Sequence, residues 1–448
     1  MKENIIGLFI KKIKGNNSIL SNTGWLLMEK AVRMTIGFFV GIWIARYLGP
    51  DKFGELSYST ALVTIVTGIA PLGLVGYIVK EFVKNPSERN VILGTTFYAR
   101  FFSGVFLYLL LIVVAIILNP KDLLIISIIM IIGVNIILQS FDSIDLYFQS
   151  EIKSKYNVMS KSLALIFVSL LNILFILKKM PLIYFAVSLG IEAIIGAGFL
   201  VYFLSRQGMK VTDWKFDYKL VIQYLKKTWP LIFSSMAAVL YLKIDQVMLR
   251  EMTNDSEVGI YSAAVKLSEV WYFIPVAFVT SFFPSLVKIS KRDPESYKRK
   301  LQKLFDFLFI LALVPSIAIT FLANYLINLT YGAEFMDASI ILTLHVWTAI
   351  FVFMRALLSK WLINEDLMLF SFLSHGLGAL ANLLLNFILI PMLGGMGASI
   401  ATIVSYSIST YFFCFLSPKT INVGKMMTNS LFLPLRGLIY LFRKKVTR

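Results

Sequence analysis

The main pattern along this chain is a series of long apolar stretches separated by short polar linkers. Each stretch is long enough for an α-helix to cross the hydrocarbon core of a bilayer, which takes about 20 residues. Backbone groups find no water partners in lipid, so spans of this kind must be helical. The stretches lie at approximately 22–46, 54–79, 91–118, 123–149, 156–177, 181–205, 229–250, 258–286, 303–329, 337–360, 366–390 and 396–416. The sequence therefore predicts an all-α polytopic membrane protein with about twelve transmembrane helices.

Composition supports this class. Hydrophobic residues make up 58% of the chain and charged residues 15%, whereas a soluble domain has about 25% charged residues. The one cysteine, Cys414, excludes an internal disulfide and a thiolate metal cluster.

The distribution of lysine and arginine predicts an orientation. With the N-terminus in the cytoplasm, the cytoplasmic segments hold 30 of the 43 basic residues and the external loops hold 6. Such a bias follows the positive-inside rule, so we expect both termini to be cytoplasmic. The net charge of +18 is then mostly a topology signal with some affinity for anionic lipid, and nucleic acid is not an expected partner.

The two halves of the chain show weak internal similarity. Residues 46–57 and 250–262 both run from an arginine through an acidic, turn-rich loop to a glycine, Gly54 or Gly259, that opens the next span. The offset is about 205 residues. Because each half has an even number of spans, the repeat is parallel, with its pseudo-two-fold axis along the membrane normal. The alternative is a chance similarity between two apolar halves.

We therefore expect two six-helix lobes. The predicted parts are an N-terminal lobe, an amphipathic cytoplasmic linker, a C-terminal lobe and a basic cytoplasmic tail, at residues 1–205, 206–228, 229–416 and 417–448.

Several motifs resemble those of the bacterial polysaccharide flippases of the Wzx type, within the multidrug/oligosaccharidyl-lipid/polysaccharide exporter superfamily. The motifs are Ala45–Gly54, Ile244–Met248, Val258–Leu267, Phe282–Leu286 and Gly394–Ala398. The resemblance implies translocation of undecaprenyl-pyrophosphate-linked oligosaccharide repeat units to the outer face of the cytoplasmic (inner) membrane by alternating access, for O-antigen or capsule synthesis. It also implies a polysaccharide polymerase and chain-length machinery as partners. One chain already supplies both lobes, so we expect a monomer.

Charged residues inside the predicted spans point to a polar interior, because an ionisable group in lipid usually marks a substrate or ion pathway. Glu29 and Arg33 are four residues apart and Lys266 and Glu269 three apart, so each couple shares a helix face and can pair. The first and eighth spans thus each present a cation beside an anion. If these faces meet at the lobe interface, they form a site there.

An anionic pyrophosphate needs fixed cations, since Arg and Lys in a hydrated cavity offset most of the cost of taking the charge out of water. The expected substrate-binding residues are Arg33, Lys30, Arg100, Lys266 and Arg355. The expected ion-coupling residues are Asp142, Asp145, Asp245 and Glu269. Hydrogen-bonding groups for sugars are expected from Asn135, Gln139, Asn172, Asn382 and Asn386.

Other interpretations stay open. Buried charges also hold helices together or extend to the membrane interface. This structural role is favoured for Glu29, Lys30, Lys161, Glu192, Lys243 and Asp306. An ion-coupled multidrug exporter of the same superfamily is the main alternative function. No catalytic residues, metal or cofactor are expected, and the chain has no P-loop motif for ATP.

Overall fold

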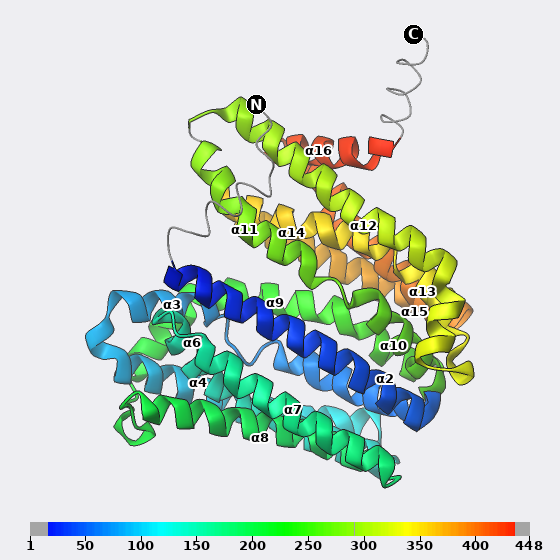
Figure 1. The fold of residues 1–448 in the computed structure, drawn as a ribbon, viewed down its shortest axis with the longest axis horizontal. Helices are drawn as coiled ribbons and strands as arrows, with labels where there is room; N and C mark the ends of the chain where they lie inside the picture. Colours follow the sequence, from blue (N-terminus) through cyan, green and yellow to red (C-terminus); the bar gives the residue numbers. More distant parts are fainter. Residues whose placement is uncertain (1–16, 291, 435–448) are drawn as a thin grey trace. The chain divides into compact units, whose positions relative to one another are not determined.

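The computed structural model describes residues 17–290 and 292–434, in which helices joined by turns and short connections make up the chain and no β-strand occurs. Ten helical segments in the described chain are long and apolar enough to cross a membrane. Figure 1 shows long helices running side by side. The fold class predicted from the sequence is therefore confirmed: the chain is an all-α, multi-pass membrane protein.

The helices follow one another with short connections. In the first half they are α2 (Asn17–Thr67), α3 (Val75–Lys84), η1 (Pro86–Glu88), α4 (Arg89–Leu118), α5 (Leu123–Leu138), η2 (Gln139–Phe141), α6 (Asp142–Ser150), α7 (Lys155–Leu177) and α8 (Leu182–Arg206). In the second half they are η3 (Val211–Asp213), α9 (Tyr218–Met252), α10 (Asp255–Glu269), α11 (Phe273–Ser290), α12 (Pro294–Thr330), η4 (Ala333–Phe335), α13 (Ala338–His345), α14 (Thr348–Asn364), α15 (Met368–Thr410), η5 (Phe412–Leu416) and α16 (Ile421–Leu431).

Two of the ten candidate segments account for the difference from the predicted twelve spans. Helix α2 leaves the helical conformation at Gly49 (φ 72°, ψ 173°), and Pro50 follows directly. Helix α15 leaves it at Gly394 (φ 55°, ψ −134°). Glycine accepts these positive φ values at little cost because it has no Cβ. Each break lies between two predicted spans, 22–46 and 54–79 or 366–390 and 396–416, so each continuous segment covers two of them. The layout of twelve helices in two six-helix lobes stays a prediction.

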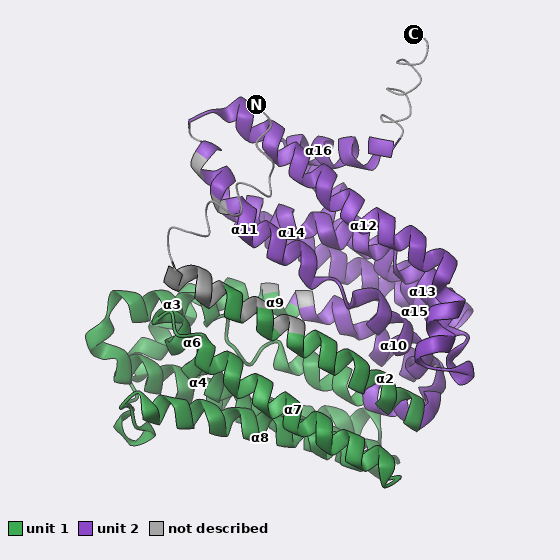
Figure 2. Cartoon of the chain, viewed as in Figure 1, with its two compact units in different colours: residues 1–47, 59–236 green, residues 48–58, 237–448 purple. Residues whose placement is uncertain are grey.

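The chain forms two compact units (Figure 2). Unit 1 consists of residues 1–47 and 59–236, and unit 2 of residues 48–58 and 237–448. Residues 48–58 include the break at Gly49 and belong to unit 2, although the chain on both sides of them belongs to unit 1. The lobe boundaries predicted from the sequence stay a prediction.

In unit 1, close helix contacts depend on small residues. A Cβ at Gly104 of α4 would lie 2.8 Å from the carbonyl oxygen of Ile136 on α5, so these two backbones approach closely, as small residues allow. The segment before α9 is attached to the start of α4. Trp214 is buried with its ring 4.9 Å from that of Phe97, and Asp217 donates its backbone N–H to Thr95 at 3.0 Å.

Outward-facing surfaces are apolar. On α4, Phe102, Phe106, Val113 and Ile117 are all more than half exposed, and their spacing of four or seven residues places them on one face. Leu111 on the opposite face is fully buried. An exposed apolar stripe of this length is expected of a helix that faces lipid.

Unit 2 has an apolar core between α11, α12, α14 and α16. Helix α12 begins with Asp293 as its N-cap, which accepts the backbone N–H of Ser296 at 2.9 Å. The side-chain and backbone hydrogen bonds from Ser296 lower the pKa of the Asp293 carboxyl below its ordinary value. At the centre of the core, Phe353 is fully buried beside Trp271, with a ring separation of 5.9 Å.

This packing predicts a position-dependent cost of removing an aromatic ring. Phe353→Ala should lower the free energy of unfolding by about 3–5 kcal/mol, because it leaves a cavity in a fully packed core. Phe321→Ala, at a side chain that is 84% exposed, should change it by less than about 1 kcal/mol. Equilibrium unfolding of the purified variants in detergent tests this, and equal losses for the two variants would contradict the described core.

Candidate functional site

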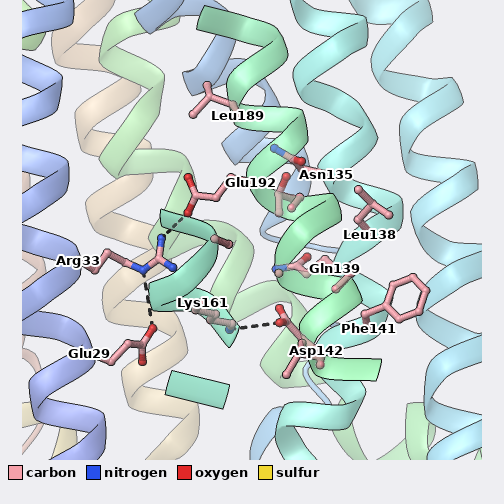
Figure 3. Close-up of a pocket in the computed structure, with 16 residues that line it drawn as sticks. Glu29, Arg33, Asn135, Leu138, Gln139, Phe141, Asp142, Lys161, Leu189 and Glu192 are labelled. Carbon is pink, nitrogen blue, oxygen red and sulfur yellow. Dashed lines mark hydrogen bonds and ion pairs between the residues drawn. The ribbon is translucent and has the colours of Figure 1, made fainter. Parts of the chain in front are cut away.

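A cavity of about 410 Å³ lies within unit 1. Side chains from α2, α5, α6, α7 and α8 line it, together with η2 (Figure 3). Five of them carry charge: Glu29, Arg33, Asp142, Lys161 and Glu192. The uncharged polar lining includes Asn135, Gln139 and Thr67. A charged cavity within membrane-spanning helices is what the buried charges of the sequence indicate.

Arg33 on α2 is held by two carboxylates. Its Nη1 lies 2.9 Å from Glu192 Oε1 on α8, and its Nε lies 3.7 Å from Glu29 Oε1 one turn earlier on α2. The pairing with Glu29 predicted from the spacing is therefore present. The Arg33 side chain is still 41% exposed, against 15% for Glu29 and 22% for Glu192. The Arg33 side chain is thus only partly covered, and it lines the cavity, where a ligand can reach it.

Lys161 on α7 forms a second cluster with two acids that share one face of α6. Its Nζ lies 3.2 Å from Asp142 Oδ1 and 3.8 Å from Asp145 Oδ2. The 3₁₀ turn η2 separates α5 from α6 and places Gln139 and Asp142 at the cavity wall (Figure 3). The second oxygen of Asp145 is buried with no hydrogen-bond partner among the described residues.

Arg100 on α4 lies in the interior of unit 1. It is 3% exposed, and its Nε and Nη1 have no hydrogen-bond partner within residues 17–290 and 292–434. Asp142 and Asp145 are close enough to interact with it electrostatically. Arg100 does not line the cavity, so the structure places this predicted phosphate ligand behind the wall.

Asp245 on α9, in unit 2, accepts hydrogen bonds from three side chains. Tyr261 donates its hydroxyl at 2.7 Å, Asn386 its amide at 2.6 Å and Thr402 its hydroxyl at 2.6 Å. The side chain is 3% exposed. Neutral donors of this kind stabilise a carboxylate. Among the described residues, no lysine or arginine forms an ion pair with Asp245.

The remaining predicted residues are not part of the cavity lining. Lys266 on α10 lies 5.8 Å above the Phe53 ring, and no ion pair joins it to Glu269 in the described chain. That predicted pairing is wrong, because Lys266 is directed to the aromatic ring. Arg355 on α14 is buried and donates to Ser374 Oγ at 2.9 Å and to the Ser409 carbonyl at 2.8 Å. These bonds tie α14 to α15. The Lys30 side chain lies outside the described residues.

Sequence reasoning gave Glu192 and Lys161 a structural role, and both prove to be charged members of the cavity wall. The feature of the sequence that could have identified these two residues is a charged side chain inside an apolar span. The pairs they form join different helices, and sequence spacing gives no information on such pairs. Within the described residues, no group of three or more His, Cys, Asp or Glu side chains is arranged to hold a metal ion.

Comparison with known proteins gives the family. Residues 19–290 match the family described as "Polysaccharide biosynthesis protein", which is more than half of the chain. The chain therefore belongs to this family of membrane proteins, and the resemblance to polysaccharide flippases found in the sequence is confirmed at that level.

A curated relative carries the name "Probable flippase AglR" and comes from Haloferax volcanii. It is 25% identical over 186 residues, which is 41% of this chain and 39% of the relative. The match thus spans about two fifths of the relative's length.

Solved structures share the fold. An inward-facing multidrug resistance MATE family transporter of the MOP superfamily has a TM-score of 0.72 at 12% identity, covering 85% of this chain and 92% of that one. The lipid II flippase MurJ in an inward closed conformation has a TM-score of 0.62 at 16% identity, covering 91% and 93%. At these identities the likeness concerns the fold alone.

The ion pairs of Lys161 with Asp142 and Asp145 are expected to contribute to the free energy of unfolding. Lys161→Met leaves Asp142 and Asp145 without their cation and should lower the free energy of unfolding by about 1–3 kcal/mol, between the values for exposed and buried pairs. Lys161→Met/Asp142→Asn should recover part of that loss. Thermal unfolding in detergent measures both, with Lys360→Met at an exposed lysine as the control. A double variant less stable than the single one would contradict the pairing.

Proposed function

We propose that this protein is a flippase for lipid-linked oligosaccharides. It moves undecaprenyl-pyrophosphate-linked repeat units from the cytoplasmic to the outer face of the cytoplasmic membrane by alternating access, for O-antigen or capsule synthesis. Membership of the polysaccharide biosynthesis family and the name of the Haloferax relative support the cargo class. The fold shared with MATE transporters and with a lipid II flippase supports a transport cycle.

The observation that carries the proposal is the polar cavity inside apolar helices. Sugars have many hydroxyl groups, and each one loses water when it crosses the membrane, at a cost unless a hydrogen bond replaces it. The cavity wall offers carboxylates, amides, a guanidinium and an ammonium. A cargo head group that is rich in hydroxyls fits such a wall, whereas the apolar tail can stay in lipid.

Arg33 is the cation best placed to receive a phosphate. Its guanidinium is partly exposed at the cavity and can form paired hydrogen bonds to phosphate oxygens. In the structure, this guanidinium is paired with the carboxylates of Glu192 and Glu29. Cargo binding therefore exchanges a carboxylate for a phosphate on the same guanidinium. Lys30, Arg100, Lys266 and Arg355 stay predicted as further contacts.

We infer that transport is driven by ion gradients and the membrane potential. One charge crossing 100 mV is worth about 2.3 kcal/mol, so a diphosphate with two charges gains about twice that on leaving a negative interior. A cation, such as a proton, that returns inward adds to this. Asp245 is the favoured ion-coupling residue because its neutral donors leave the negative charge uncompensated. Asp142, Asp145 and Glu269 are the other candidates.

One observation favours a second function. Three carboxylates and two cations line the cavity, and a surplus of carboxylates suits a cationic compound. An ion-coupled multidrug exporter of the same superfamily is thus the alternative. The exposed Arg33 and the family match favour the oligosaccharide.

The proposed setting is the cytoplasmic (inner) membrane, with both termini in the cytoplasm. The chain acts as a monomer of two six-helix lobes, beside a polysaccharide polymerase and chain-length machinery.

Arg33→Gln should reduce export of the repeat unit by about tenfold or more, the loss expected when a charge-assisted hydrogen bond worth about 1.5–3 kcal/mol is removed. The measurement is surface glycan formed in a strain whose own flippase gene is deleted, with equal membrane levels of each variant. Arg206→Gln, at an exposed arginine that contacts Tyr202, is the matched control. Export by Arg33→Gln at the control rate would remove Arg33 from the proposed site.

Asp245→Asn should uncouple transport from the driving cation, because it removes the charge and keeps the side-chain shape. In proteoliposomes, wild-type transport is expected to respond to an imposed cation gradient, whereas the variant should respond at least about tenfold less, as for loss of a charged partner. Asp293→Asn, outside the membrane spans, is the control. An unchanged gradient response in Asp245→Asn would rule this residue out as the coupling group.

A further inference from the structure

Residues 48–58 touch the first turns of α10 backbone to backbone. A Cβ at Gly54 would overlap the carbonyl oxygen of Asp255, and a Cβ at Gly259 would overlap the carbonyl oxygen of Pro50. Both glycines have ordinary helical φ values, so what requires glycine here is space. Glycine allows helices to approach until Cα–H groups meet carbonyl oxygens.

This contact is reciprocal in a way that matches the sequence repeat. Pro50 stands four residues before Gly54, and Asp255 stands four residues before Gly259. Both glycines and both oxygen-bearing residues are therefore related by the same offset of 205 residues. A Cβ at Gly54 would lie 3.0 Å from the Gly259 nitrogen, and one at Gly259 would lie 3.1 Å from the Gly54 nitrogen.

Gly54 meets the residue four before Gly259, and Gly259 meets the residue four before Gly54. A contact that is repeated in this way is isologous, which means that a two-fold axis passes through it. The contact between Gly54 and Gly259 therefore joins equivalent positions of the two repeats. This observation supports the internal duplication independently of the weak similarity between the two sequences.

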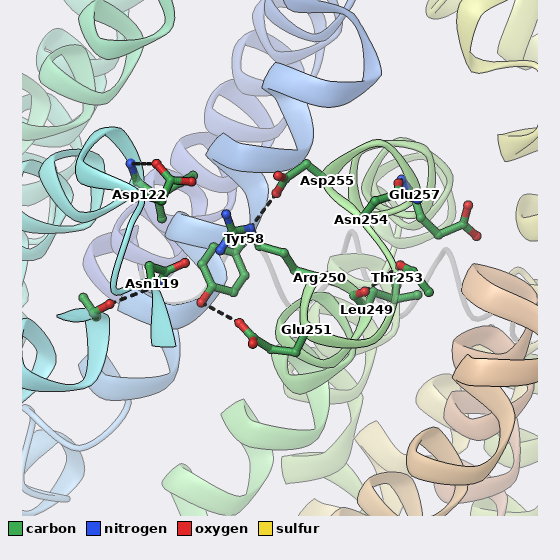
Figure 4. Close-up of polar contacts among 12 residues, drawn as sticks. Tyr58, Asn119, Asp122, Leu249, Arg250, Glu251, Thr253, Asn254, Asp255 and Glu257 are labelled. Atoms are coloured by element: carbon green, nitrogen blue, oxygen red, sulfur yellow. Dashed lines mark hydrogen bonds and ion pairs between the residues drawn. The ribbon is translucent and has the colours of Figure 1, made fainter. Parts of the chain in front are cut away.

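Polar contacts join Tyr58 to residues at the junction between α9 and α10 (Figure 4). Arg250 at the end of α9 donates its Nε to Asp255 at 2.6 Å, and its guanidinium lies 4.4 Å from the centre of the Tyr58 ring. The Tyr58 hydroxyl donates to Glu251 at 3.2 Å. These bonds fasten the end of segment 48–58 to the junction between α9 and α10.

The start of α10 also supports the break in α15. Glu257 accepts the backbone N–H of Gly395 at 2.6 Å, next to the positive-φ residue Gly394. That N–H follows the interruption of the helix, and the carboxylate replaces the partner that a continuous helix provides. One short stretch, residues 254–259, thus holds segment 48–58 on one side and the Gly394 break on another.

We propose that the contact between Gly54 and Gly259 is a latch that holds segment 48–58 on unit 2 and opens during the transport cycle. The inference rests on the proposed function, since alternating access requires contacts that form in one state and separate in another. Backbone-to-backbone packing suits a latch because such a contact either forms in full or is absent. The positive-φ Gly49 at the start of the segment provides a flexible joint.

The test measures opening without any cargo. Ser262→Cys places a nearly isosteric, buried thiol on α10, three residues after Gly259, in a Cys414→Ser background. Gly54→Ala and Gly259→Ala add a methyl group that forces the helices apart. Gly198→Ala is the control, because nothing lies within 4 Å of a Cβ there. The readout is the rate of maleimide labelling of the purified protein in proteoliposomes.

We expect labelling of Ser262→Cys to rise at least about fivefold in Gly54→Ala and Gly259→Ala and to stay unchanged in Gly198→Ala. Labelling at the control rate in both variants would overturn the latch. If the alanine variants do not fold, Tyr58→Phe removes the hydroxyl that donates to Glu251 and also interacts with Arg250. This variant should raise labelling about twofold, whereas no rise would overturn the proposal. Because no cargo is present, a failed oligosaccharide assay would count against the proposed function and leave the labelling result standing.

Discussion

The constraint on which this structure depends is that charge inside a membrane must be neutralised. An ionised group in hydrocarbon costs many kcal/mol unless another group compensates it. The chain meets this need in two ways. In unit 1, Arg33 and Lys161 each lie between two carboxylates. In unit 2, Asp245 relies on three neutral donors. The first arrangement fixes four helices around one cavity, and the second compensates a carboxylate with hydrogen bonds alone.

The same groups that stabilise the fold also give it a binding capacity. Ion pairs at a cavity wall are only partly desolvated, so a ligand of the right charge can replace one partner at little net cost. Arg33 is such a group, because its exposed guanidinium already holds two exchangeable carboxylates. Arg355 is the opposite case: it is buried, and its Nη1 donates to Ser374 and to the Ser409 carbonyl, which ties α14 to α15. Exposure thus separates a binding arginine from a structural one.

Much of the fold could be predicted from the sequence, because lipid imposes one periodicity and one minimum length on every span. The contact between Glu29 and Arg33 was also predictable, since both lie on one helix. The partnership of Arg33 with Glu192 was not, because it depends on how α2 and α8 are placed in space. Lys266 shows the limit of spacing rules: it was expected to pair with Glu269, yet it lies over the Phe53 ring. The equal offset of Gly54 and Gly259 was visible in the sequence, whereas their mutual contact required coordinates.

The role that we propose for the charged cavity is to carry the head group of a lipid-linked oligosaccharide across the membrane. The most direct test deletes the gene and determines on which side of the membrane the lipid-linked repeat units lie, together with the amount of surface glycan. If the protein is the flippase, we expect the repeat units to be trapped on the cytoplasmic side and the surface glycan to be lost. Normal surface glycan, with new sensitivity of the cells to cationic drugs, would contradict it and identify a drug exporter.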